Sequence, residues 1–179
     1  MADAAAKELT IAVGESDHSQ GNPQAPLILV EYGDYECPYC GEAYPRVKRV
    51  QKELGENLRF VFRNFPLSQI HPHALSAAMA AEAAALQGKF WEMHDMLYEN
   101  QRGLSEANLM AYANALELDF AKFNEDLQSD EVEQRVRGDF MGGVRSGVNG
   151  TPTFFINGKR HNGSYDSATL LAALQESAE

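Results

Sequence analysis

The chain has 179 residues, of which 44% are hydrophobic, and its 26 acidic and 15 basic side chains give a net charge of −11. This length suits one compact domain, or a core with one inserted subdomain, and the apolar content excludes a disordered chain. The negative charge argues against nucleic acid as a partner, because phosphate binding needs clustered Lys and Arg. No stretch approaches 18 uninterrupted apolar residues, so we expect no stable insertion into a membrane.

The first ten residues lack the layout of a secretory signal, because Asp3 comes before the first lysine and no apolar stretch follows a basic one. The sequence as written therefore predicts a cytoplasmic protein. A periplasmic location is expected instead if a signal peptide has been removed. Residues 1–26 are predicted to be a polar, turn-rich lead-in segment with one short strand around residues 9–13.

Residues 27–30 are a continuous apolar run, which is typical of a strand buried on both faces. Apolar residues then recur at helical spacing, namely Ala43, Val47, Val50 and Leu54. Gly55 is expected to end this helix, and Pro45 inside it is expected to cause a kink. Residues 58–63 predict a second strand, and a strand–helix–strand unit implies parallel strands with a right-handed crossover.

A long helical stretch is predicted from His73 to about residue 144, and His71 and His73 are expected to begin its first helix. Three residues are expected to cap later helices, namely Ser105, Asp119 and Ser129. A hairpin with an Asn157–Gly158 turn and a final helix after Asp166 follow. The predicted α/β chain therefore has a core of residues 27–65 and 149–179, interrupted by an all-helical insertion of residues 66–148.

Two cysteines, Cys37 and Cys40, lie in the turn between the first core strand and its helix. A thiol at a helix N-terminus faces unsatisfied N–H groups and the positive end of the helix dipole, which stabilise thiolate over thiol. Cys37 is therefore predicted to be a nucleophile. Cys40, one turn further into the helix, is placed to attack a mixed disulfide on Cys37 and release the partner.

Three other interpretations of this pair stay open. A structural disulfide across so few residues would close almost no loop and would stabilise the fold little. A zinc site would need two more ligands, and the histidines show no close pair of the usual spacing. The two cysteines could also be unrelated and inert, although the strand-to-helix position disfavours this. We therefore expect redox chemistry and no metal.

Two segments carry a resemblance to a known family. The first is residues 30–40, Val-Glu-Tyr-Gly-Asp-Tyr-Glu-Cys-Pro-Tyr-Cys, and the second is residues 150–158, Gly-Thr-Pro-Thr-Phe-Phe-Ile-Asn-Gly. Together with His71–Pro72 and the Gln-Gly-Lys-Phe-Trp of residues 87–91, they resemble the DsbA-like thiol-disulfide oxidoreductases of the thioredoxin superfamily. The resemblance implies a thioredoxin fold with βαβ and ββα halves around a helical insertion.

The same resemblance implies roles for several residues. Pro152 is expected to have a cis peptide bond beside the redox-active Cys37–Cys40 disulfide, which leaves the backbone of Thr151 to pair with an extended substrate. Glu31 lies in an apolar strand where burial disfavours its ionised form, and it is expected to take and return the proton of the buried cysteine. An edge carboxylate paired with Lys or Arg is the alternative for Glu31.

The dipeptide between the cysteines, Pro38–Tyr39, is the one found in glutaredoxins. It lacks the histidine of the strongly oxidising periplasmic members, so we expect a less oxidising couple. The resemblance implies protein thiol or disulfide substrates, a redox recycling partner and no cofactor beyond the dithiol. Two other functions stay open, namely a glutathione-linked, glutaredoxin-like reductase and a non-enzymatic zinc-binding or interaction module.

Overall fold

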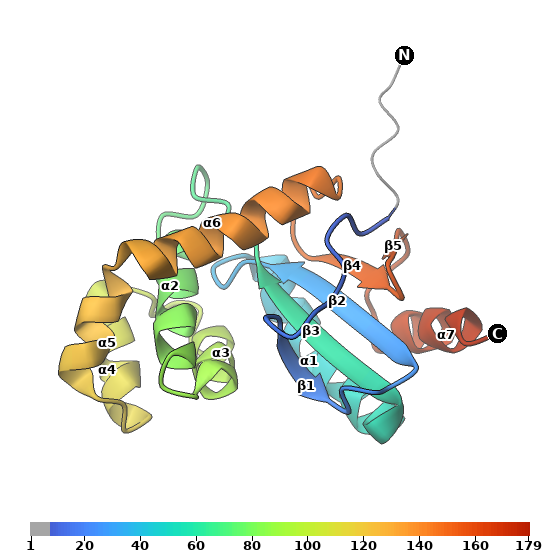
Figure 1. Cartoon of the computed structure of the whole chain (residues 1–179), viewed down its shortest axis with the longest axis horizontal. Coiled ribbons are helices and arrows are strands. Elements are labelled where there is room, and N and C mark those ends of the chain that lie inside the picture. The colour runs from blue at the N-terminus through green and yellow to red at the C-terminus, as the bar shows by residue number, and fades with distance from the viewer. Residues whose placement is uncertain (1–7) are drawn as a thin grey trace, which may run out of the picture. The chain divides into compact units, whose positions relative to one another are not determined.

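The apolar run predicted as the first core strand becomes the middle strand of the sheet. A computed structural model describes residues 8–179 and contains a five-stranded sheet in the order β1-β3-β2-β4-β5 (Figure 1). Its strands are β1 (His18–Gly21), β2 (Leu27–Gly33), β3 (Leu58–Asn64), β4 (Thr153–Ile156) and β5 (Lys159–His161). Residues 1–7, on which the expectation about a signal peptide mainly rests, lie outside the described range.

The strands form because their apolar side chains are removed from water on both faces. Leu29, Val30 and Tyr32 of β2 are each at most 1% exposed, as expected of a central strand. β2 pairs with β4 in antiparallel register, and β4 pairs with β5 through the hairpin. Asn157 and Gly158 both have positive φ, which confirms the predicted type I′ turn.

The strand expected around residues 9–13 is wrong. The first strand is instead β1, which pairs antiparallel with β3 and is too polar to show an apolar pattern. The backbone near residues 9–13 is held by single contacts. The guanidinium of Arg63 donates to the carbonyls of Ile11 and Ala12, and the Leu9 N–H donates to the Gly158 carbonyl.

The long helix after β2 is α1 (Pro38–Leu54), which continues through Pro45 and is followed by a short 3-10 turn, η1 (Gly55–Asn57). Gly55 has positive φ and ends the helix as predicted. The final helix is α7 (Ser167–Ser177), where the Asp166 side chain accepts the N–H of Thr169 as its cap.

The predicted helical stretch consists of α2 (Ala74–Ala85), α3 (Phe90–Glu99), α4 (Glu106–Ala115), α5 (Phe120–Leu127) and α6 (Asp130–Arg145). The expected caps are confirmed, because Ser105, Asp119 and Ser129 accept the N–H groups of Asn108, Lys122 and Val132. Among residues 8–179, no helix is both long enough and apolar enough to span a bilayer.

The chain folds into two compact units. The sheet unit consists of the chain up to Gly33, Glu42–Arg63 and Met141–Glu179. The helical unit consists of Asp34–Gly41 and Asn64–Phe140, so it includes the cysteine segment. The division expected from the sequence, with an insertion of residues 66–148, stays a prediction. The observed unit ends inside α6, a helix that the sequence pattern gave no reason to divide.

Candidate active site

Cys37 and Cys40 lie at the start of α1 and are in the dithiol state. Cys37 precedes Pro38, which suits the first position of a helix because its missing N–H would have no partner there. The Cys37 carbonyl accepts the N–H of Gly41 at 3.1 Å, which is the first bond of the helix. Cys37 is 3% exposed and Cys40 is fully buried, so Cys37 is the more accessible thiol of the pair.

Asp34 fixes the turn that carries the cysteines. Its carbonyl accepts the N–H of Cys37 at 3.1 Å, and its own N–H donates to Sγ of Cys40 at 3.5 Å. Its side chain accepts the N–H of Glu36 at 2.8 Å and the N–H of Leu67 at 3.0 Å. These contacts hold the turn from Asp34 to Cys37 in one conformation and point its backbone groups at both cysteines.

Gln101, which follows α3, holds the same turn through its side-chain amide. Its Nε2 donates to the carbonyls of Tyr35 and Cys37, each at 2.9 Å. This approach needs Gly41, because a Cβ there would lie 2.0 Å from Oε1 of Gln101. The turn that carries the cysteines is therefore connected to the helical segments of its own unit.

Tyr35 anchors the turn in the helical unit. Its hydroxyl lies 3.0 Å from Nδ1 of His94, and its ring contacts those of His94 and Tyr98. Tyr35 is 1% exposed and His94 is 3% exposed. A buried ring that also hydrogen-bonds is held more firmly than an apolar one. This cluster therefore fixes the position of the turn that carries the cysteines.

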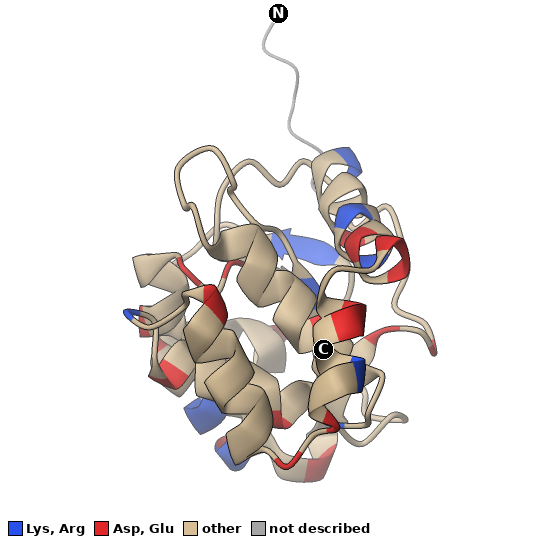
Figure 2. Ribbon diagram, turned by 90° about the vertical axis from the view of Figure 1, so that its left-hand side faces the viewer, with Lys and Arg blue, Asp and Glu red and all other residues tan. Residues whose placement is uncertain are grey.

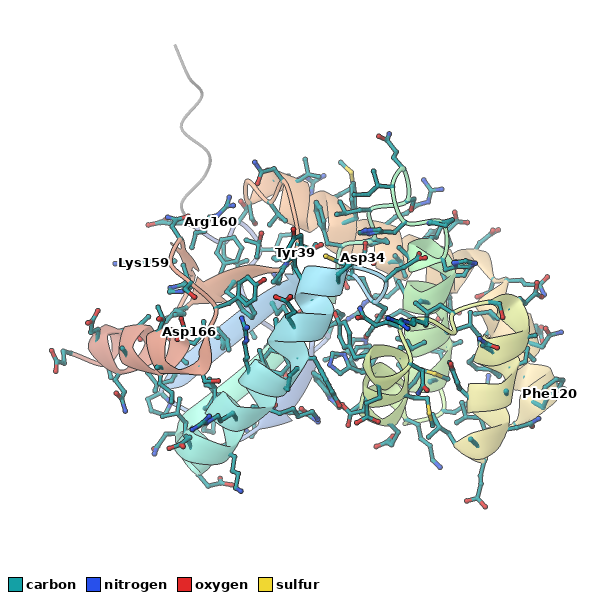
Figure 3. All side chains as sticks on the ribbon, turned by 180° about the vertical axis from the view of Figure 1, so that it is seen from behind. Asp34, Tyr39, Phe120, Lys159, Arg160 and Asp166 are labelled. Carbon is teal, nitrogen blue, oxygen red and sulfur yellow. The ribbon has the colours of Figure 1, made fainter. Side chains whose placement is uncertain are left out.

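Tyr39, unlike Tyr35, is exposed to solvent. It is 61% exposed, and Figure 3 shows it with Asp34 near the N-terminal end of α1. Of the expected dipeptide, Tyr39 is therefore the member that presents a large ring to solvent. An exposed aromatic ring two residues after Cys37 offers a surface on which another molecule can pack.

The sheet unit holds the other residues expected at the site. Glu31 of β2 is 2% exposed and lies opposite Phe154 in the register with β4. The Thr151–Pro152 peptide bond is cis, the isomer that the resemblance implies, and it directly precedes β4. The Thr153 hydroxyl donates to the Gly150 carbonyl at 2.7 Å, which fixes the turn before the strand.

Acidic side chains outnumber basic ones in the sequence, 26 to 15. Figure 2 shows Asp and Glu spread over several elements, with Lys and Arg scattered among them. Within residues 8–179, no group of three or more His, Cys, Asp or Glu side chains is placed to hold a metal ion. The sequence predicts that His71 and His73 begin the first helix of the insertion, whereas α2 begins at Ala74 with His73 as its N-cap residue. The side chains of His71 and His73 contact Asp34 and Glu36 of the cysteine turn, respectively.

Sequence reasoning missed three residues of this site. Asp34 was visible as an acid between an apolar strand and the first cysteine, yet its partners lie more than 30 residues away. Gln101 had no sequence signal, because a lone glutamine in a loop is ordinary. His71 showed only its place before a helix, since its contact depends on the tertiary fold.

This chain is 48% identical over 160 residues to a protein of Salinispora arenicola named Na(+)/H(+) antiporter NhaA 1, and the match covers 89% of this chain and 24% of that protein. The chain thus spans about a quarter of that relative's length.

Two solved structures have a similar fold. A thioredoxin-like oxidoreductase from Silicibacter pomeroyi is 28% identical, with a TM-score of 0.79, and the match covers 92% of this chain and 93% of that one. The thiol-disulfide exchange protein alpha-DsbA2 from Wolbachia pipientis is 22% identical, with a TM-score of 0.80, over 90% and 87% of the two chains. Their likeness and the observed elements agree on a thioredoxin fold interrupted by helices. Because the family model described as Thioredoxin matches residues 14–176, the chain belongs to the thioredoxin family.

Proposed function

We propose that this chain is an enzyme that exchanges its Cys37–Cys40 dithiol and disulfide with protein substrates. The observation that carries the proposal is the placement of both cysteines at the start of α1, with the more accessible one at the helix N-terminus. The N-terminus of a helix favours a thiolate, which is the reactive form in disulfide exchange. The similarity to an oxidoreductase that is 28% identical supports the same chemistry.

The reaction proceeds in two exchanges. In the reducing direction, the Cys37 thiolate attacks one sulfur of a substrate disulfide, and the other substrate sulfur leaves with the electron pair and takes up a proton. Cys40 then loses its proton and attacks Sγ of Cys37, which releases the second substrate thiol. The chain ends as a disulfide and the substrate as a dithiol, so two electrons have moved. The oxidising direction is the reverse.

Other residues have supporting roles in this proposal. Glu31 takes the proton from Cys40 and returns it in the reverse reaction. Thr151 and Pro152 position an extended substrate chain by backbone pairing. The dipeptide Pro38–Tyr39 sets the reduction potential of the Cys37–Cys40 couple, and Tyr39 is the residue of the two that a substrate can contact. The dithiol itself carries the electrons, so the chemistry needs no metal, nucleotide or flavin.

The proposed function is tested with a disulfide-bonded protein such as insulin, under a constant supply of reductant. The wild type should accelerate reduction, and Cys37→Ser should abolish the acceleration. Cys40→Ser should instead accumulate a covalent complex with the substrate through Cys37, because the resolving thiol is missing. Acceleration by Cys37→Ser equal to that of the wild type would contradict the proposal. Faster turnover of a glutathione mixed disulfide than of insulin would favour the glutaredoxin-like reductase.

We also propose a membrane ion antiporter as one protein partner. The supporting observation is that the matched segment makes up 24% of a relative named as an antiporter. A test would replace that segment in the Salinispora arenicola protein by this chain and measure Na⁺/H⁺ exchange in vesicles. The exchange rate should differ between oxidised and reduced vesicles, and Cys37→Ser should remove the difference. A rate independent of redox state in both forms would reject this partner.

A further inference from the structure

The side chain of Asp34 is a buried carboxylate with its partners on two separate segments. The side chain has no exposed surface. Oδ1 accepts the N–H of Glu36 within the cysteine turn. Oδ2 accepts the N–H of Leu67 at 3.0 Å and lies 2.7 Å from Nδ1 of His71. Asp34 therefore joins the cysteine turn to the segment that precedes α2.

A buried carboxylate loses its hydration, and it is stabilised only where hydrogen-bond donors replace the water. Backbone N–H groups supply two donors here, and His71 supplies the third when Nδ1 carries the ring proton. Removing one donor leaves the buried carboxylate with fewer hydrogen bonds, which is unfavourable, and weakens the hold on the position of Asp34. His71 is thus the only side-chain donor among the Asp34 carboxylate contacts described above, and it can be altered without changing the backbone.

The backbone of Asp34 meets both cysteines. Its N–H points at Sγ of Cys40, and its carbonyl accepts the N–H of Cys37. A thiolate accepts a hydrogen bond more strongly than a thiol or a disulfide sulfur does, because the acceptor is charged. The N–H of Asp34 therefore favours the ionised form of Cys40.

We propose that Asp34 is a positioning residue for Cys40 in the resolving step and that His71 holds it in place. This inference rests on the proposed function and deepens it. In that step Cys40, having lost its proton, attacks Sγ of Cys37 in the mixed disulfide. The Cys37–Cys40 bond forms, the bond from Cys37 to the substrate sulfur breaks, and that sulfur leaves with the electron pair and takes up a proton.

The chain contains a matched control pair two residues further along both segments. Glu36 accepts the N–H of His73 at 2.6 Å, and its Oε1 lies 3.0 Å from Nδ1 of His73. The His73 side chain is 48% exposed, whereas that of His71 is 17% exposed. The backbone N–H of Glu36 points at the Asp34 carboxylate rather than at a sulfur. The proposal therefore assigns the effect to His71 and not to His73.

The experiment separates attack from resolution by stopped-flow fluorescence with a labelled, disulfide-bonded peptide. His71→Leu removes the donor, and His71→Asn returns an amide N–H near the place of Nδ1. His71→Leu should slow resolution roughly tenfold and leave attack within about twofold, as expected for loss of a hydrogen bond to a charged group. His71→Asn should recover most of the rate, and His73→Leu should leave both steps within about twofold.

A second readout does not need exchange activity. In a Cys37→Ser background, thiolate absorbance at 240 nm reports ionisation of Cys40, and adding His71→Leu should raise the pKa of Cys40 while adding His73→Leu should not. Near-ultraviolet circular dichroism checks that each variant is folded, and His71→Gln replaces any His71→Leu protein that is not.

Equal effects of the His71 and His73 variants, or equal slowing of attack and resolution, would overturn the inference. A wild type that performs no exchange would instead remove the proposed function. In that case the Cys40 titration still decides the inference about Asp34, because an unchanged Cys40 pKa in the His71 variants would reject it.

Discussion

Glu31 and Phe154 are directly opposite each other in the antiparallel pairing of β2 and β4. Phe154 comes two residues after Pro152, so this register brings the carboxylate-bearing strand beside the strand that starts at the cis peptide bond. Glu31 is 2% exposed, an unusual environment for an acid, since carboxylates are seldom fully buried. Burial removes water from the carboxylate and so disfavours its ionised form, which is why Glu31 is proposed to exchange a proton.

The first prediction concerns Glu31→Gln. The variant should slow resolution by Cys40 more than attack by Cys37, because in the proposed mechanism only the resolving thiol gives its proton to Glu31. Stopped-flow measurement of mixed-disulfide formation and breakdown checks this, with Glu56→Gln on the exposed 3-10 turn as control. Equal slowing of both steps would show that Glu31 has no specific role in proton transfer.

The second prediction concerns Gly41. Gly41→Ala places a methyl group where the Gln101 amide lies, so that amide loses its bonds to the Tyr35 and Cys37 carbonyls. The exchange rate should fall several-fold, and Gln101→Ala should have a similar effect. Because both changes remove the same contacts, the double variant should be no slower than Gln101→Ala alone.

Gly138→Ala is the matched control for Gly41→Ala, since a Cβ at Gly138 in α6 meets no atom within 4 Å. It should stabilise the helix by up to about 1 kcal/mol and leave the exchange rate unchanged. Additive losses in the Gly41 and Gln101 double variant would mean that the two residues act independently.

The third prediction concerns Arg63, which ties the lead-in segment to the sheet. Its guanidinium makes two bonds to Asp17, at 2.8 and 3.0 Å, and one to the Tyr32 hydroxyl at 2.9 Å. Burial acts to lower the pKa of Arg63, but the hydrogen bonds and charges of Asp17 and Tyr32 raise it above its usual range. Arg63→Met removes both guanidinium bonds to the Asp17 carboxylate, which is only 9% exposed, and should lower the free energy of unfolding by about 3–5 kcal/mol.

Urea unfolding measures this loss, with Lys122→Met as the control. The Lys122 side chain is 52% exposed and pairs with Asp126 at 3.3 Å, so its removal should change the free energy of unfolding by less than about 1 kcal/mol. Similar small losses for both variants would mean that the Arg63 contacts do not hold the lead-in segment.

The fourth prediction concerns acid stability and Asp166. Hydrogen bonds from the Ser164 hydroxyl, then from the N–H and hydroxyl of Thr169, lower the pKa of Asp166 from 3.8 to about 2. Because the folded pKa is below the unfolded one, the ionised carboxylate stabilises the fold above about pH 4, and this contribution is lost as the pH falls towards 2.

Asp166→Asn keeps an oxygen that can cap α7 but removes the titration. The difference in free energy of unfolding between wild type and Asp166→Asn should therefore shrink as the pH falls from 4 to 2. Denaturant unfolding at several pH values in this range measures it. A difference that stays constant across the range would show that Asp166 titrates alike in the folded and unfolded chain.

The element order could be predicted because each core segment has a clear period or boundary. Several short segments encode their own local structure, and the structure confirms the elements predicted from them. These segments are the apolar residues 27–30, the Asn157–Gly158 turn and the caps Asp119 and Asp166. β1 could not be predicted, because its His-Ser-Gln-Gly sequence has no apolar pattern and its pairing with β3 decides its conformation.

Residues of the site could be predicted only where a short stretch of sequence indicates their role. Cys37 and Cys40 followed from their spacing and place before a helix. Asp34 and His71 lie 37 residues apart and meet only in the folded chain. Long-range side-chain contacts of this kind leave no period or motif in a single sequence.

We propose that Cys37 and Cys40 form a reversible redox couple suited to exchange with protein thiols. Equilibration in glutathione buffers of graded ratio, followed by quantification of thiols, measures its reduction potential. We expect a two-electron transition with a midpoint between about −270 mV and about −120 mV, the range from thioredoxin to the strong periplasmic oxidant. A chain that forms no Cys37–Cys40 disulfide in any buffer would contradict it, and so would a midpoint outside that interval.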